Sequence, residues 1–259
     1  MHTSKHSSTL PAHRYTLVVD LDRCTGCGSC GTACAVENNI PPAPEKATER
    51  TGVVWMRVRE VQAARSGSDD STFVPIPCQQ CENPPCVDVC PQRAIEYDPR
   101  TGIVGQIPVR CLGCRYCMVA CPYHTRSFNW WKPEWPAGME TTLNPDVSIR
   151  TRGVVEKCNF CFHRLQQARA KAAAAGAKDE APGDYVPACV EACPTSAFLF
   201  GDMNDPDSEV AKAAKGEGTF RLLEKLGTDP KVIYRSARPW VRQTAEGALP
   251  RNGKEEHRG

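Results

Sequence analysis

The sequence contains no long apolar segment. Nothing in its 259 residues approaches the roughly 18 consecutive apolar residues of a membrane span, and VVWM at 53–56 is among the longest apolar runs. The start, MHTSKHSSTLPAHRYTLVVDLDRC, has neither the apolar core of a signal peptide nor a twin arginine, because Arg14 stands alone. We therefore predict a chain without a transmembrane segment, made in the cytoplasm and not exported by a signal of its own.

The chain also has a small net charge and few aromatic residues. Lys and Arg number 32 against 30 Asp and Glu, so the formal net charge is only +2 and gives no reason to expect a nucleic-acid partner. Aromatic residues make up 7 % of the chain, whereas Gly and Pro number 19 and 22, which indicates a loop-rich fold. There is no P-loop, no GxGxxG and no recognisable nucleophile–base pair. The sequence therefore gives no support for a catalytic role of the chain on its own.

What the chain has in excess is cysteine, with 16 residues. Disulfides require an oxidising compartment, usually reached through a signal peptide, so metal centres are the better explanation. The cysteines form four quartets, and this repeat fills most of the chain between 24 and 193. The first to fourth quartets are, in order, Cys24, Cys27, Cys30 and Cys34; Cys78, Cys81, Cys86 and Cys90; Cys111, Cys114, Cys117 and Cys121; and Cys158, Cys161, Cys189 and Cys193.

The spacing within the quartets indicates iron–sulfur clusters. Two intervening residues let a tight loop carry thiols around one face of a cluster, and glycines such as Gly26 and Gly113 allow the sharp turn. Three intervening residues correspond to one helical turn, which carries the fourth thiol away from that loop. In two-cluster ferredoxins this fourth cysteine ligates the other cluster. We therefore expect each cluster to take three sulfurs from one quartet and one from a partner quartet.

Two other kinds of metal site fit the pattern less well. A zinc ribbon also uses C-x2-C knuckles, but it has no use for a further cysteine four residues after a triplet. A structural zinc-ribbon scaffold without a redox role is the alternative of a different class. A Rieske centre needs two histidine ligands, and Cys161-Phe162-His163 supplies only half of its pattern.

Taken together, the quartets resemble those of a known family. Four quartets in this order, with C-x2-C-x4-C-x3-C-P second and the fourth split by an insertion, resemble the iron–sulfur electron-transfer subunit of complex iron–sulfur molybdoenzymes. Its members serve dimethyl sulfoxide, polysulfide, tetrathionate, thiosulfate, arsenate and sulfite oxidoreductases, and a related chain serves cytochrome-linked nitrite reduction. The resemblance covers about residues 14 to 240, including VVDLDRC, CPYHTRSFNWW and FGDMNDPDS.

The resemblance implies how the quartets pair. Quartets one and four would share two clusters, and quartets two and three would share the other two, giving four [4Fe–4S] clusters. No cysteine would remain for a catalytic role. The implied ligands are Cys24, Cys27, Cys30 and Cys193 for cluster 1; Cys78, Cys81, Cys86 and Cys121 for cluster 2; Cys90, Cys111, Cys114 and Cys117 for cluster 3; and Cys34, Cys158, Cys161 and Cys189 for cluster 4.

The resemblance also implies the fold. We expect an α+β protein of two nested bacterial ferredoxin-like dicluster units with a pseudo-twofold relation, rich in loops, plus a C-terminal helical tail. The expected divisions are a disordered N-terminus at 1–13, an outer unit at 14–71 and 136–202, an inner unit at 72–135, a helical extension at 203–242 and a disordered tail at 243–259.

Local patterns add further expectations. Strands are predicted within 14–21, 53–61 and 103–110, where β-branched residues lie between turn residues. Short helices are predicted after the third cysteine of each quartet, and an exposed helix and loop at 168–184. In the tail, one helix should begin at Asp205-Pro206 and stop at Gly216. A second, TFRLLEKLG at 219–227, would align Phe220, Leu223 and Leu226 on one face.

The predicted function is electron transfer between other subunits of a complex. The chain would pass single electrons between a molybdopterin-containing catalytic subunit and a membrane-integral, quinone-interacting subunit or a cytochrome. The alternative is that the same electron-transfer subunit serves a formate dehydrogenase or a nickel–iron hydrogenase. We expect a peripheral membrane-associated complex, either cytoplasmic or carried to the periplasm with a twin-arginine-exported partner. Arg110, Arg115 and Lys157 flank predicted ligands and would raise reduction potentials, unless they are merely surface cations.

Overall fold

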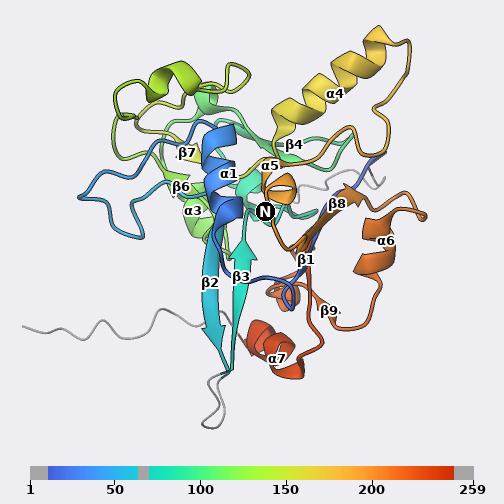
Figure 1. Cartoon of the computed structure of the whole chain (residues 1–259). Helices are drawn as coiled ribbons and strands as arrows, with labels where there is room; N and C mark the ends of the chain where they lie inside the picture. The colour runs from blue at the N-terminus through green and yellow to red at the C-terminus, as the bar shows by residue number, and fades with distance from the viewer. Residues whose placement is uncertain (1–10, 64–69, 248–259) are drawn as a thin grey trace, which may run out of the picture.

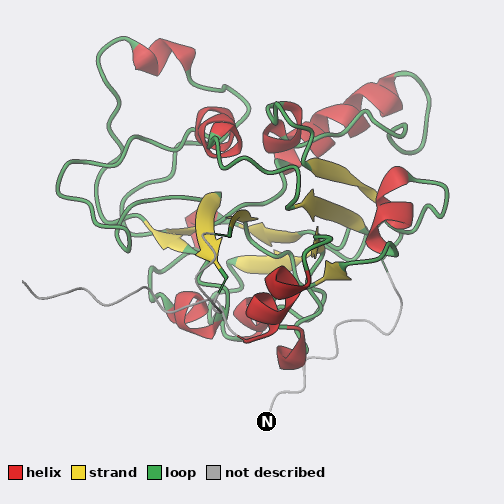
Figure 2. Cartoon of the chain, turned by 60° about the horizontal axis from the view of Figure 1, so that its bottom comes forward, coloured by secondary structure: helices red, strands yellow, loops and turns green. Residues whose placement is uncertain are grey.

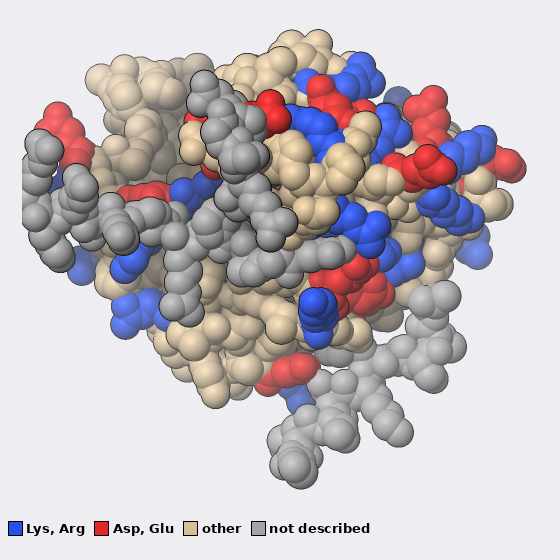
Figure 3. Space-filling model, turned by 90° about the horizontal axis from the view of Figure 1, so that it is seen from below, with Lys and Arg blue, Asp and Glu red and all other residues tan. Residues whose placement is uncertain are grey.

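The computed structural model describes residues 11–63 and 70–247. It is an α+β arrangement of small sheets, short helices and long loops (Figures 1 and 2). Within the described residues, no helix is long and apolar enough to cross a membrane. Figure 3 shows one face of the surface, where acidic and basic side chains lie next to one another.

The largest sheet joins the two ends of the described chain. Its four strands lie in the order β8 (Phe198–Asp202), β1 (Tyr15–Asp20), β10 (Val232–Arg235) and β9 (Thr219–Phe220). Strand β1 is buried along its whole length, runs antiparallel to β8 and parallel to β10, and sets Val18 opposite Ile233. A strand covered on both faces needs apolar residues at successive positions, which YTLVVD supplies.

Three two-stranded ribbons complete the β structure of the described residues. They are β2 (Arg57–Gln62) with β3 (Ser71–Ile76), β4 (Ile95–Tyr97) with β5 (Val104–Gln106), and β6 (Ser127–Phe128) with β7 (Val155–Glu156). All three pairs are antiparallel. The β6–β7 ribbon joins segments that lie on either side of the 129–154 loop, so it fixes the third quartet close to the start of the fourth.

The helices that carry cysteines pack in two pairs. Helix α1 (Ser29–Glu37) packs against α5 (Ala188–Glu191), and α2 (Pro85–Asp88) packs against α3 (Tyr116–Ala120). The other helices of the described chain are α4 (Phe162–Ala174), α6 (Glu209–Ala214), α7 (Pro239–Gly247) and the 3-10 turns η1 (Pro108–Arg110), η2 (Met139–Thr142) and η3 (Glu224–Leu226). Helix α4 projects from the body of the molecule (Figure 1).

The predicted strands exist but are shorter than expected. The segment 53–56 is not part of β2, although Trp55 and Met56 are buried in the main core. The end of the third predicted strand forms η1 instead, because Pro108 has no backbone N–H to donate to a neighbouring strand. A predicted helix is found near the third cysteine of each quartet, and α4 begins earlier than predicted, directly after Cys161.

The prediction of a helical tail is wrong in two respects. Helix α6 begins after Ser208, whose Oγ accepts a hydrogen bond from the N–H of Ala211 at 3.1 Å, and not at Asp205-Pro206. The helix predicted over 219–227 does not form, because Phe220 lies in β9 and stacks on Tyr234 of β10. Pairing of β10 with the N-terminal strand is a long-range contact that overrides the local helical pattern.

The predicted disorder at the two ends also needs correction. His13 lies within the ordered fold, with its Nδ1 2.9 Å from Oδ2 of Asp202 and its backbone N–H on the carbonyl of Arg100. Helix α7 continues to Gly247, and Val241 and Ala245 on it are buried. Disorder is therefore wrong for 11–13 and 243–247, while 1–10 and 248–259 lie outside the described residues.

Candidate metal centres

The structure brings the cysteines into four groups, which we name site 1 to site 4 after the predicted clusters 1 to 4. Three of the groups line separate cavities. The cavity of site 2 is lined by Cys78, Cys81, Cys86 and Cys121, that of site 3 by Cys90, Cys111, Cys114 and Cys117, and that of site 4 by Cys34, Cys158, Cys161 and Cys189.

Site 1 is identified by the mutual influence of its thiols. Burial, with smaller contributions from the nearby thiols of Cys24, Cys193 and Cys27, raises the pKa of Cys30 to about 11. Burial likewise raises the pKa of Cys24, again with Cys193 and Cys27 contributing. Thiols of the first and fourth quartets therefore meet here.

Thiols of sites 2 and 4 also have raised pKa values. Burial, with smaller contributions from neighbouring thiols, raises the pKa of Cys81 to about 12 and the pKa of Cys158 to about 12. Burial followed by the thiols of Cys158, Cys189 and Cys161 raises the pKa of Cys34 well above its ordinary value. Four buried thiols cannot all ionise without a compensating positive charge, and a metal core supplies one.

The loop of each C-x2-C pair has the same backbone conformation. The residue before the second cysteine has a positive φ in every quartet: Gly26 at 72°, Gln80 at 49°, Gly113 at 72° and Phe160 at 57°. This left-handed turn aims a backbone N–H back at the first thiol. The N–H of Gly113 reaches Cys111 Sγ at 3.4 Å, and that of Phe160 reaches Cys158 Sγ at 3.4 Å.

The last cysteine of a quartet also has a recurring partner, four residues further on. The backbone N–H of Ala94 donates to Cys90 Sγ at 3.2 Å, and that of Ala197 donates to Cys193 Sγ at 3.3 Å. The Oγ1 of Thr125 lies 3.8 Å from Cys121 Sγ. Hydrogen bonds to cluster sulfurs are among the features that set reduction potentials.

Exposure divides the sites into two kinds. All four thiols of site 2 and all four of site 4 are buried. Sites 1 and 3 each contain one exposed cysteine, Cys27 and Cys114 respectively. Electrostatic interactions between thiols of different sites order the sites, since Cys30 acts on Cys34, Cys78 on Cys158, and Cys86 on Cys117. The spatial order is therefore 1–4–2–3, with the exposed thiols at the two ends.

The residues present fit [4Fe–4S] clusters. Four thiols per site are the donor set of such a cluster, and the linings of sites 2 to 4 are otherwise largely apolar. Among the described residues, no group of three or more His, Cys, Asp or Glu is arranged to hold a single metal ion.

Comparison with known proteins decides the family. The family model of the 4Fe-4S dicluster domain matches residues 70–137. The chain is 49 % identical over 239 residues to the menaquinone reductase iron–sulfur cluster-binding subunit of Nitratidesulfovibrio vulgaris, a match covering 91 % of this chain and 94 % of the relative. The chain belongs to the iron–sulfur subunits of multi-subunit reductases.

Other relatives agree with this assignment. The chain is 38 % identical to an iron–sulfur subunit of Halobacterium salinarum that is named for dimethyl sulfoxide reductase, over 91 % of this chain and 86 % of the relative. It is 39 % identical to the Hdr-like menaquinol oxidoreductase iron–sulfur subunit 1 of Archaeoglobus fulgidus, over 85 % and 82 %. The family resemblance is thereby confirmed, as is the prediction that this iron–sulfur subunit transfers electrons and is not itself the catalytic subunit.

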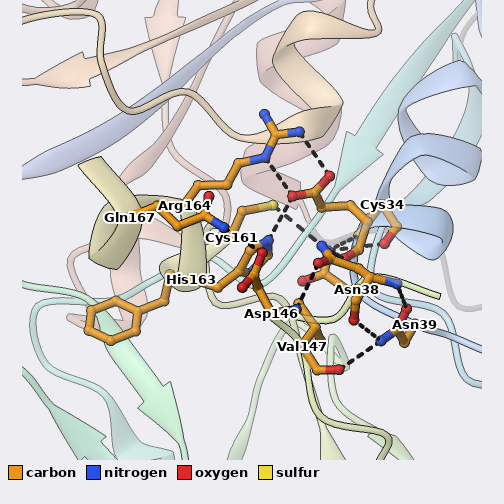
Figure 4. Close-up of polar contacts among 12 residues, drawn as sticks. Cys34, Asn38, Asn39, Asp146, Val147, Cys161, His163, Arg164 and Gln167 are labelled. Atoms are coloured by element: carbon orange, nitrogen blue, oxygen red, sulfur yellow. Dashed lines mark hydrogen bonds and ion pairs between the residues drawn. The ribbon is translucent and has the colours of Figure 1, made fainter. Parts of the chain in front are cut away.

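Around site 4, this iron–sulfur subunit has a polar shell that the cysteine pattern did not indicate (Figure 4). The side-chain Nδ2 of Asn38 donates to the carbonyl of Cys34 at 3.0 Å and lies 3.8 Å from Cys34 Sγ. Beside it, Glu37 accepts two hydrogen bonds from Arg164 and lies 2.6 Å from His163 Nε2. The bonds from Arg164, together with that from His163, hold the pKa of Glu37 below its ordinary value although burial opposes them.

The three cations singled out from the sequence differ in environment. Arg110 is half exposed and pairs with Glu96 on the surface. The guanidinium of Arg115 stacks over Phe128, 5.2 Å from the ring centre. Of the three, only Lys157 is buried, at 1 % exposure, where its Nζ donates to the carbonyls of Val104 and Cys158.

A fourth cation near the sites was not predicted from the sequence. Arg126 is only 3 % exposed and lines the site 2 cavity beside Cys86 and Cys121. The signal that was available is its place five residues after Cys121, in CPYHTR, but a lone arginine in a loop is usually a surface residue.

Proposed function

We propose that the chain carries four [4Fe–4S] clusters, one in each of sites 1 to 4, and passes electrons along them. The ligands would be the four cysteines that meet at each site. When bound, a [4Fe–4S] cluster takes up and releases single electrons. The chain's part is to hold the clusters in a fixed row, to keep water from the inner ones, and to set their potentials.

The observation that carries this proposal is the order of the sites together with their exposure. Sites 4 and 2 lie in the middle and expose no thiol, whereas sites 1 and 3 lie at the ends and expose Cys27 and Cys114. A row with a buried middle and two accessible ends suits entry of electrons at one end and exit at the other. Such a row does not suit the storage of electrons at isolated sites.

The surface around the site 3 end suits a partner protein. Several large apolar side chains within five residues of Cys114 in the sequence are exposed, namely Val109, Leu112, Tyr116 and Val119, the first of them at 94 %. Exposed apolar groups of this kind are typical of interaction surfaces. We propose that a redox partner docks here and brings its own acceptor or donor group close to site 3.

The partners are proposed from the family. One end would meet a molybdopterin-containing catalytic subunit, and the other a membrane-integral, quinone-interacting subunit or a cytochrome. Two of the relatives are named for menaquinone and menaquinol, which favours a menaquinone-linked partner. The chain would then be a peripheral member of a membrane-associated complex, on whichever side of the membrane its partners lie.

The nested arrangement of two ferredoxin-like units belongs to this proposal. The packing of α1 on α5 and of α2 on α3 supports it, since each pair joins the quartets expected to exchange their fourth cysteines. The ribbon β6–β7 would tie the inner unit to the outer one.

The proposal is tested on the complete complex, purified anaerobically with its native partners. Val119→Glu places a charge on the apolar surface next to site 3 without touching a ligand. It should slow electron exchange between the row of clusters and one partner by about tenfold or more, with the EPR spectrum unchanged. Leu226→Glu, on the exposed turn η3, is the matched control and should have no effect. Unchanged electron exchange with both partners in Val119→Glu would overturn the assignment of site 3 as an end.

A further inference from the structure

Arg126 occupies an unusual position for an arginine. Its side chain is 3 % exposed and lies in the loop between Cys121 and β6, where it lines the site 2 cavity. One end of its guanidinium, Nη1, donates to Oε1 of Gln106 at 3.1 Å. Its Nη2 is buried and has no hydrogen-bond partner among the described residues. No carboxylate pairs with Arg126 in the ion pairs of the described chain.

This guanidinium lies between two sites. It lines the site 2 cavity together with Cys78, Cys86 and Cys121. Its hydrogen-bond partner Gln106 lines the site 3 cavity together with Cys117. The charge therefore lies at the junction between two neighbouring sites.

Reduction adds negative charge to a cluster, so a fixed positive charge nearby favours the reduced state. The effect is large where water is excluded, because the local dielectric constant is low. Arginine stays protonated under such conditions. We propose that Arg126 is a shared electrostatic residue that raises the reduction potentials of the clusters in sites 2 and 3. This inference rests on the proposed function, because it requires clusters in both sites.

Lys157 supplies an independent comparison at the next junction. It is 1 % exposed, and its Nζ donates to the carbonyl of Cys158, which belongs to site 4, and to the carbonyl of Val104, which lines the site 2 cavity. Arg126 thus acts at the junction of sites 2 and 3, Lys157 at that of sites 4 and 2, and the two cations share site 2. Two buried cations with overlapping targets predict a specific pattern of shifts.

The test is an EPR-monitored redox titration of the four clusters in the full chain, with iron content measured on each sample. Arg126→Gln should lower two of the four midpoint potentials. For each of the two clusters, the equilibrium constant for one-electron reduction should fall about tenfold, which corresponds to about 59 mV. Lys157→Gln should also lower two, and one of them should be common to both variants. Arg126→Lys should keep most of the effect. Lys215→Gln, an exposed cation, should shift none.

Different failures lead to different conclusions. Unchanged potentials in a fully loaded Arg126→Gln protein would overturn the inference, and so would equal shifts of all four clusters. If Arg126→Gln loses iron but Arg126→Lys retains it with near-native potentials, the charge is what matters and the inference stands. If both variants lose iron, Arg126 acts through its shape and the inference fails. A wild-type chain with fewer than four clusters would instead contradict the proposed function.

Discussion

The side-chain Nδ2 of Asn38 lies 3.7 Å from the Sγ of Cys161, a residue 123 positions further along the chain. The same amide lies 3.8 Å from Cys34 Sγ, so one donor serves two thiols of site 4 that come from different quartets (Figure 4). Asn38 is 1 % exposed and follows the last residue of α1. It takes the place that a backbone N–H takes four residues after Cys90 and Cys193.

Asn38→Leu removes this donor while keeping a side chain of similar shape. Loss of a hydrogen bond to the ligand sulfurs should destabilise the reduced state, so one of the four midpoint potentials should fall and the other three should not move. EPR-monitored titration measures this. Asn129→Leu is the matched control, because Asn129 is equally buried but donates only to a carbonyl and a carboxylate. A fall of the same potential in both variants would show a general loosening and contradict the assignment.

Gly113 shows how closely the backbone approaches a site. Its φ is +72°, and a Cβ added to it would lie 2.2 Å from the carbonyl oxygen of Gly153. The left-handed backbone alone costs an L-residue roughly 1–2 kcal/mol, and the collision with backbone cannot be relieved by a rotamer change. Gly113→Ala should therefore lose about four irons, those of site 3, when iron per chain is measured after anaerobic reconstitution.

A matched variant separates the effect of left-handed backbone strain from that of the steric collision with the Gly153 carbonyl. Gly176 follows α4 with a φ of +77°, and a Cβ there would meet nothing within 4 Å. Gly176→Ala should lower the stability of the chain by the strain alone and keep the full iron content. Equal iron loss in the two variants would refute the explanation given for Gly113.

Exposure of the end sites predicts the order in which iron is lost. Cys27 in site 1 and Cys114 in site 3 are open to solvent, whereas sites 2 and 4 are closed. A strong iron chelator added to the oxidised protein should remove about eight irons in a fast phase and about eight in a slow one. The absorbance of the iron chelate monitors the release. Release in a single phase would contradict the difference between end and middle sites.

Lys231 predicts a dependence of stability on alkaline pH. It is 0 % exposed, and burial lowers its pKa from 10.5 to about 8 although Glu82, 3.4 Å away, opposes the shift. Between pH 8 and 10.5 the folded chain has released this proton while the unfolded chain still holds it. Raising the pH through this window therefore favours the folded state.

The measurement compares wild type with Lys231→Met in denaturant at several pH values. The stability of wild type relative to the variant should rise by up to about 3 kcal/mol from about pH 8 to about pH 10.5 and stay flat below about pH 7. For Lys215→Met, a change at an exposed position, the difference in stability from wild type should not change with pH. A difference between wild type and Lys231→Met that does not change with pH would mean that Lys231 is not perturbed in the folded chain.

Local spacing predicted far more of the cysteine arrangement than of the polar groups around it. The cavities of sites 2 to 4 are lined by the cysteines that the family resemblance grouped together. Local spacing indicated only that the fourth thiol of a quartet turns away from the other three, and the resemblance supplied which quartets meet. Asn38 and Arg126 carry no such signal. Each reaches its site through tertiary packing, and each belongs to a residue type that is ordinarily exposed.

The tail shows the same limit for the fold. Phe220 and Leu223 fit a helical pattern, yet Phe220 stacks on Tyr234 in a sheet and Leu223 has a φ of 52°. The deciding contact is the parallel pairing of β10 with β1, which lies at the other end of the described chain. A local pattern contains no information about such a partner.

We propose that sixteen thiols hold four clusters in one row. The most direct measurement is the iron, zinc and sulfide content of the anaerobically purified chain, combined with spin quantification by EPR after reduction. We expect about sixteen irons per chain, no stoichiometric zinc, and four reducible centres whose signals broaden through mutual interaction. About eight irons, or zinc in place of iron, would contradict it.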